Sequence, residues 1–161
     1  IVAAGLGKVE EEITKMQEDK EIEFDVQRPI IQQLVERPFR EVVFSKIVKE
    51  EYNMTCAMTG ISIKNERGKS EIEAAHIKPV KFNGPDSVRN GIALCRTFHW
   101  MFDYGLVSVA YNNEILFKEI VPDRVRQLIN DNWRIRIPAN HNAMPHTEFL
   151  RFHRERIYMP S

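Results

Sequence analysis

The sequence is poor in cysteine, with two in 161 residues, and this scarcity excludes several kinds of protein. Two thiols cannot build a disulfide-rich secreted scaffold or a four-cysteine zinc site. Long apolar runs are also missing: no stretch approaches the roughly 20 residues that a membrane helix needs, so we expect no membrane partner. The formal net charge is zero, so total charge gives no indication of a nucleic-acid partner.

The distribution of charge is more informative than its sum. Residues 1–55 carry 8 basic and 12 acidic side chains, whereas residues 56–161 carry 15 basic and 11 acidic ones. An enzyme that binds a phosphate backbone needs local positive potential and not a basic total. An ordinary solvated surface gives the same balances, so charge alone leaves both interpretations open.

Length and composition predict one globular domain with an extension. The 43% hydrophobic and 29% charged residues are ordinary for a globular protein. The chain does not begin with Met, and its apolar opening lacks the preceding basic stretch of a signal peptide. We expect residues 1–36 to be an N-terminal extension or linker helix that follows an upstream domain, and residues 37–161 to form one domain.

Hydrophobic periodicity predicts a mixture of helices and short strands, which is an α+β fold. A helical rhythm runs through residues 8–24, and a second helix is expected to begin at Pro38 and end at Tyr52, with Phe39, Val42, Val43, Ile47 and Val48 on its buried face. Short strands are expected around a turn in 54–63 and at 72–77, 90–95, 106–109, 115–118 and 133–137. Further helices are expected at 97–104, 122–130 and 148–158.

Four side chains in the middle of the chain have the chemistry of a small metal-dependent nuclease site. They are His76, Asn90, His99 and Asp103. Imidazole is the side chain whose pKa lies closest to working pH, so it suits proton transfer. His99 and Asp103 are four residues apart in a predicted helix and therefore share one face.

The order and spacing of these residues resemble the HNH motif of the ββα-metal endonucleases. The longer sequence pattern around these residues is more similar to HNH proteins of the restriction-endonuclease type. It comprises Cys56-Ala57-Met58-Thr59-Gly60, Ala75-His76-Ile77, Arg89-Asn90-Gly91-Ile92-Ala93-Leu94 and His99-Trp100-Met101-Phe102-Asp103-Tyr104-Gly105-Leu106. The resemblance covers roughly residues 37–157, and its specific part is the core motif at 56–109.

This resemblance implies a ββα-metal (HNH) motif embedded in accessory helices and short strands. It implies a metal-dependent DNA endonuclease that hydrolyses phosphodiester bonds, as the nuclease domain of a restriction-modification or defence enzyme in the cytoplasm. The expected partner is double-stranded DNA, and a homodimer would allow both strands to be cut. A non-catalytic nucleic-acid-binding or interaction module with a degenerate HNH fold is the alternative, and a nuclease that prefers RNA or single strands also stays open.

The resemblance assigns a role to each residue of the motif. His76 is expected to be the general base, and Asn90 to orient it or its loop by hydrogen bonds. His99 and Asp103 are expected to bind one divalent metal ion, Mg²⁺ or Mn²⁺. Many HNH sites place a metal-binding Asp or His immediately before the base, where this chain has Ala75. Glu73 is therefore considered as a further ligand, direct or through water, or as a surface carboxylate.

Other residues near the motif are given simpler roles. Phosphate contacts are expected from Lys78, Lys81, Arg89 and Arg96, rather than from the arginines near the C-terminus, which we expect to pair with Glu148 and Glu155. Trp100, Phe102 and Tyr104 are expected to pack. Many HNH proteins have a Cys-x-x-Cys where this chain has the single Cys56 or Cys95, so we expect two reduced, buried, neighbouring thiols. A disulfide and a structural zinc site are the alternatives.

Overall fold

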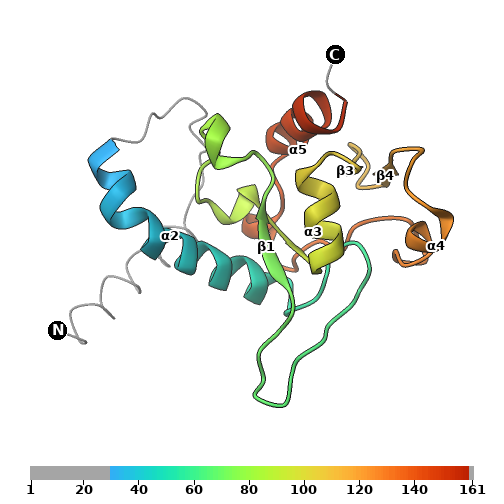
Figure 1. The fold of residues 1–161 in the computed structure, drawn as a ribbon, viewed down its shortest axis with the longest axis horizontal. Coiled ribbons are helices and arrows are strands. Elements are labelled where there is room, and N and C mark those ends of the chain that lie inside the picture. Colours follow the sequence, from blue (N-terminus) through green and yellow to red (C-terminus); the bar gives the residue numbers. More distant parts are fainter. Residues whose placement is uncertain (1–29, 160–161) are drawn as a thin grey trace.

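The computed structural model describes residues 30–159, and their side chains from residue 38 onward. The predicted helical segment at 8–24 lies outside this range. Helices alternate with two small antiparallel sheets, which confirms the α+β class (Figure 1). Within residues 30–159, no helix combines the length and apolar character needed to pass through a bilayer.

Helix α2 (Ile30–Glu51) begins earlier than its sequence predicts. Pro38 lies inside the helix and not at its first position, so that prediction was wrong. An internal proline removes one helical hydrogen bond and costs about 3 kcal/mol, so the packed face must offset this cost. That face consists of Val43, Phe44, Ile47 and Val48, whereas Val42, which we expected in the core, is 69% exposed.

Strands β1 (Glu73–His76) and β2 (Gly91–Leu94) pair antiparallel, with His76 opposite Gly91, and α3 (Arg96–Asp103) follows directly. Both α2 and α3 contact this hairpin (Figure 1). Gly91 is required where α2 crosses, because a Cβ there would lie 2.2 Å from a methyl group of Val48. The ββα unit therefore packs closely against α2 next to His76.

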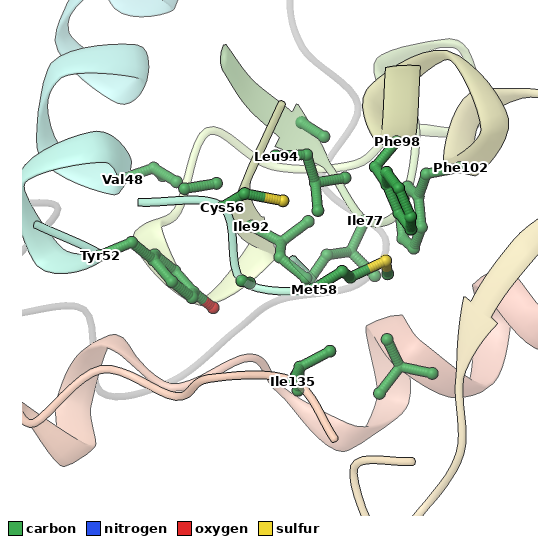
Figure 2. Packing of buried hydrophobic residues seen from close by; sticks show 14 of the residues in the cluster. Val48, Tyr52, Cys56, Met58, Ile77, Ile92, Leu94, Phe98, Phe102 and Ile135 are labelled. Carbon is green, nitrogen blue, oxygen red and sulfur yellow. The ribbon is translucent and has the colours of Figure 1, made fainter. Parts of the chain in front are cut away.

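The core joins the first turn of the motif to both motif strands and to α3. Figure 2 shows Met58, Ile92, Leu94 and Phe98 packed together near Cys56. Cys56 and Cys95 are buried and form no disulfide, and a hydrogen bond from the Cys95 thiol lowers the pKa of Cys56. This confirms the prediction of two buried, neighbouring thiols.

The second half of the chain adds small accessory elements. They are β3 (Val107–Val109), β4 (Ile115–Phe117), α4 (Asp123–Arg126), the 3-10 turn η3 (His141–Ala143), α5 (Thr147–His153) and the π-helical turn η4 (Arg154–Tyr158). Two further 3-10 turns, η1 (Val80–Phe82) and η2 (Val88–Asn90), lie in the loop between β1 and β2. The β3–β4 hairpin confirms the predicted strands around 106–118. The last helix forms as predicted but ends in the wider π turn.

Two predicted strand regions are not strands. Residues 54–63 form turns, and residues 133–137 contribute only a single bridge, from Arg134 to Glu114. Trp133 has a φ of 59°, which interrupts the extended run. Arg136 then donates its backbone N–H to Ala57. The backbone hydrogen bonds of this segment therefore go to different neighbours. The alternation of apolar and polar residues in the sequence does not reveal this.

His153 is a buried structural histidine, 1% exposed. Its ring stacks on Phe102 at 3.7 Å between centroids, Nε2 lies 2.8 Å from the Phe102 carbonyl oxygen, and Nδ1 lies 2.8 Å from Ser108 Oγ. A carbonyl only accepts, so Nε2 carries the proton and Nδ1 accepts from the serine hydroxyl. Burial lowers the pKa of His153 to about 4.

This histidine predicts acid sensitivity in a defined window. Because the unfolded chain takes up the proton near pH 6.5 and the folded chain near pH 4, stability is complete above pH 6.5 and falls as the pH drops to 4. The expected loss from this residue is about 3 kcal/mol. Urea unfolding at pH 7.0, 5.5 and 4.5 measures it. His153→Gln removes the titration, so its free energy of unfolding should fall less over this range; an equal fall in both proteins would refute the assignment.

Candidate active site

One hollow of about 540 Å³ receives side chains from β1, η1, α3 and η4. His76 comes from β1, whereas His99 and Asp103 come from successive turns of α3, and all three line this hollow. His76 is 23 or more positions before the other two in sequence, and the ββα fold brings α3 back beside β1 so that all three share one surface. Ala75 is fully buried in β1 and does not belong to the lining, which Ala74 contributes instead.

Asn90 is completely buried and holds the loop that follows His76. Its Oδ1 accepts from the Lys78 backbone N–H at 2.8 Å, and its Nδ2 donates to the carbonyls of Lys78 and Pro85 at 3.0 and 2.9 Å. Gly84 allows this loop to close, because a Cβ there would lie 1.7 Å from the Lys78 carbonyl oxygen. Every one of these bonds joins the amide to the loop backbone, so Asn90 fixes the path of the chain on both sides of the loop.

His76 is held by two residues that sequence reasoning did not identify. Its ring stacks on Phe44 of α2 at 4.0 Å between centroids, with the planes 11° apart. Its Nε2 lies 2.9 Å from Asp86 Oδ1, and the Asp86 side chain is only 6% exposed. A carboxylate accepts and does not donate, so Nε2 carries the proton and Nδ1 is left as the basic nitrogen.

Two carboxylates flank the His99 ring. Glu73 Oε2 lies 2.7 Å from Nδ1, and Asp103 Oδ2 lies 3.3 Å from Nε2. Hydrogen bonding to Asp103 and then to Glu73 raises the pKa of His99, although burial acts in the opposite direction. The pairing with Glu73 fixes the orientation of the ring, so Nε2 is the nitrogen that shares a side with Asp103.

These residues fit an open site for a divalent ion. His99 and Asp103 supply one imidazole and one carboxylate on the same side of α3, and Mg²⁺ sites commonly use few protein ligands and keep several waters. Glu73 occupies the other ring nitrogen, as carboxylates behind metal-binding histidines do. Among the described residues, no group of three or more His, Cys, Asp or Glu side chains could hold a metal ion.

The four predicted phosphate-binding cations are not in one place. Lys81 lines the hollow, and Lys78 lies over the ring of Phe152. Arg96 Nε lies 3.3 Å from Glu73 Oε1, and Arg89 Nε donates to the Met144 carbonyl at 3.3 Å. The two lysines are therefore on one side of the hollow, and both arginines have partners within the protein.

The aromatic residues of α3 divide between core and surface. Phe102 is buried as predicted, but Trp100 and Tyr104 are 56% and 69% exposed, so the prediction that they pack was wrong. Their rings lie 4.9 Å apart, and Tyr104 lines the hollow. Helical spacing places them on the outer face of α3, which sequence reasoning had not separated from the inner one.

The fold and the shared hollow define a ββα domain of the nuclease type. Residues 56–110 match the family of HNH endonucleases. The structure is similar to the modification-dependent TagI restriction endonuclease, with a TM-score of 0.56 and 25% sequence identity. This similarity covers 69% of this chain and 36% of that one, so the chain spans about a third of that protein's length. No curated protein matches the sequence.

The motif, the architecture and both similarities agree. Residues 56–110 are similar to HNH endonucleases, and the similar solved structure is described as a restriction endonuclease. This confirms the resemblance that the motif residues carry.

Proposed function

We propose that this chain is the nuclease domain of a DNA endonuclease that hydrolyses phosphodiester bonds with the help of one divalent metal ion. The observation that carries the proposal is that His76, His99 and Asp103 line one hollow. The similarity of residues 56–110 to HNH endonucleases supports the same reaction class. The chemistry needs an activated water, stabilisation of charge on the phosphate, and help for the departing 3′ oxygen.

His76 is proposed as the general base. The Asp86 contact at 2.9 Å favours the proton on Nε2, so Nδ1 is the nitrogen that would take a proton from the attacking water. The stack on Phe44 limits rotation of the ring about its bond to the strand. Asn90 acts through the loop backbone that leads from His76 to Asp86, so it is proposed as a positioning residue.

His99 and Asp103 are proposed to hold the ion, Mg²⁺ or Mn²⁺. When bound there, it would polarise the phosphate and stabilise charge on the leaving oxygen. Glu73 is proposed to orient His99 through Nδ1 and not to bind the ion directly. These roles leave the remaining coordination positions for water and substrate oxygens.

Asp86→Asn tests the arrangement around the base. We expect the cleavage rate constant to fall by roughly 10²-fold or more, which is within the usual contribution of a general base. An asparagine amide can donate to Nε2 of His76, which favours the tautomer with the proton on Nδ1. DNA affinity should change little, and Asp86→Glu should restore part of the rate. Single-turnover cleavage over a pH series measures both effects. A full rate with an unchanged pH profile in Asp86→Asn would show that the contact serves only the fold.

A substrate panel tests the proposed function as a whole. We expect duplex DNA to be cut in Mg²⁺ or Mn²⁺, and single-stranded DNA and RNA of the same sequence to be cut more slowly. The structural relative is described as modification-dependent, so the panel should contain duplexes with and without modified bases. Preferential cleavage of RNA would overturn the proposed substrate.

The second candidate is a non-catalytic nucleic-acid-binding module. Two observations favour it. Ala75 stands where many HNH sites have a metal-binding residue, and the described residues contain no group of three or more side chains that could hold a metal ion. This candidate predicts DNA binding without cleavage in any divalent ion. A homodimer, which would let two sites cut opposite strands, is proposed for the nuclease, and sedimentation velocity in the presence of DNA tests it.

A further inference from the structure

Two aromatic rings near the hollow carry three cations between them. Phe82 of η1 and Phe152 of α5 are 5.4 Å apart between centroids. Lys78 Nζ lies 5.1 Å from the Phe152 centroid and Arg156 Cζ lies 5.9 Å from the same centroid, while Lys81 Nζ lies 5.3 Å from that of Phe82. Figure 1 shows α5, in red, next to the green segment that carries η1. These five residues are called the basic clamp below.

The three cations of the clamp form no ion pair within the part of the chain that the structure describes. Neighbouring arginines behave differently: Arg151 pairs with Glu148, and Arg154 donates to the Val109 carbonyl at 2.8 Å. Like charges that gather without forming ion pairs repel one another, and cation–π contacts at exposed sites return only about 0.5–1 kcal/mol each. A bound polyanion would relieve this repulsion.

The clamp adjoins the proposed reaction site. Lys81 lines the same hollow as His76, and so does Ile157, the residue that follows Arg156. Lys78 is the residue whose backbone N–H and carbonyl both bond to the buried Asn90. One loop follows His76 and carries both lysines, and the side-chain amide of Asn90 fixes its backbone.

We propose that the basic clamp binds the phosphodiester backbone of DNA beside the phosphate that lies in the hollow, with Arg156 as the cation contributed by the C-terminal helix. The guanidinium offers a planar pair of donors for one phosphate, and the two lysines act as point charges. This differs from the sequence prediction, which set the C-terminal arginines aside in favour of Arg89 and Arg96. The position of the bound phosphate relative to the cut rests on the proposed function, whereas the binding itself does not.

Salt-dependent binding tests the clamp without any cleavage. A fluorescently labelled duplex is titrated with protein in a chelator, and anisotropy gives the affinity at several salt concentrations. Each lost phosphate contact should reduce the slope of log K against log salt by about 0.9. We expect this reduction in Arg156→Ala and Lys81→Ala, whereas Arg156→Lys should keep the wild-type slope. The matched control is Arg151→Ala, on the same C-terminal segment but paired with Glu148.

The outcomes separate the clamp from the nuclease. If the duplex binds with the expected slopes but is never cut when Mg²⁺ is added, the clamp stands and the proposed function fails. If the duplex is cut but Arg156→Ala has the same slope as Arg151→Ala, the clamp is overturned and the nuclease stands. Failure of the wild type to bind the duplex at low salt overturns the clamp outright. Arg156 is exposed, so its substitution leaves the core intact, and thermal unfolding of each variant checks this.

Discussion

His76→Ala is expected to lower the single-turnover rate of DNA cleavage by roughly 10²–10⁴-fold, the usual contribution of a general base. The affinity for DNA should stay close to that of the wild type, because the proposed role of the imidazole is proton transfer and not phosphate binding. A rapid-quench time course with protein in excess gives the rate, and anisotropy in a chelator gives the affinity.

A matched control exists for this variant. His141 is exposed and lies outside the lining of the hollow. His141→Ala should therefore cut at the wild-type rate. A His76→Ala protein that cuts as fast as His141→Ala would remove His76 from the mechanism.

His99→Ala and Asp103→Ala are expected to abolish both cleavage and divalent-ion binding at the hollow. The physical reason is that each removes one of the two proposed ligands, so the proposed site keeps a single protein donor. Titration calorimetry with Mn²⁺ measures the binding directly, without relying on activity. The loss of affinity should exceed the roughly 10–100-fold that outer-shell changes cause.

Glu73→Gln separates ligands from orienting residues. Its carboxylate lies 2.7 Å from the far nitrogen of His99, so we expect an intermediate loss of roughly 10–100-fold in metal affinity. If Glu73→Gln abolishes binding as completely as Asp103→Ala does, Glu73 is a ligand. If none of the three variants alters ion binding, the non-catalytic module is the better account.

The motif residues could be predicted from the sequence because their spacing is tied to short, regular elements. His99 and Asp103 are four apart on one helix, and β1 and β2 pair in the register that returns Asn90 to the loop after His76. The burial of both thiols followed in the same way from their position in the motif. Helical spacing alone places His99 and Asp103 on one face, whereas the expectations for Asn90 and the two thiols came from the resemblance to the HNH motif.

Asp86 could not be predicted in the same way. It comes from the irregular loop after His76, and its approach depends on Asn90 and on the close contact at Gly84. The sequence indicated Asp86 only weakly, as an acidic residue in a loop whose two ends were expected to meet. The proposed role of Arg156 was not predicted for a different reason. Its place beside Lys78 depends on the packing of Phe152 of α5 against Phe82 of η1, two elements about 70 residues apart.

The errors in secondary structure also have physical causes. Pro38 was read as a helix start because proline favours that position, but the backbone of α2 is already helical from Ile30. Residues 133–137 alternate like a strand, yet the positive φ of Trp133 sends their backbone bonds to separate partners. In the second case long-range hydrogen bonds overrode a local preference.

The most direct test of the central claim is addition of metal to a preformed complex. Wild-type protein and His76→Ala are each mixed with supercoiled plasmid in a chelator, binding is verified, and excess Mg²⁺ or Mn²⁺ is then added. We expect both proteins to bind intact plasmid, and only the wild type to convert it to nicked or linear DNA after the ion is added. Wild-type protein that stays bound to uncut plasmid in every divalent ion, on modified and unmodified DNA alike, would contradict the central claim.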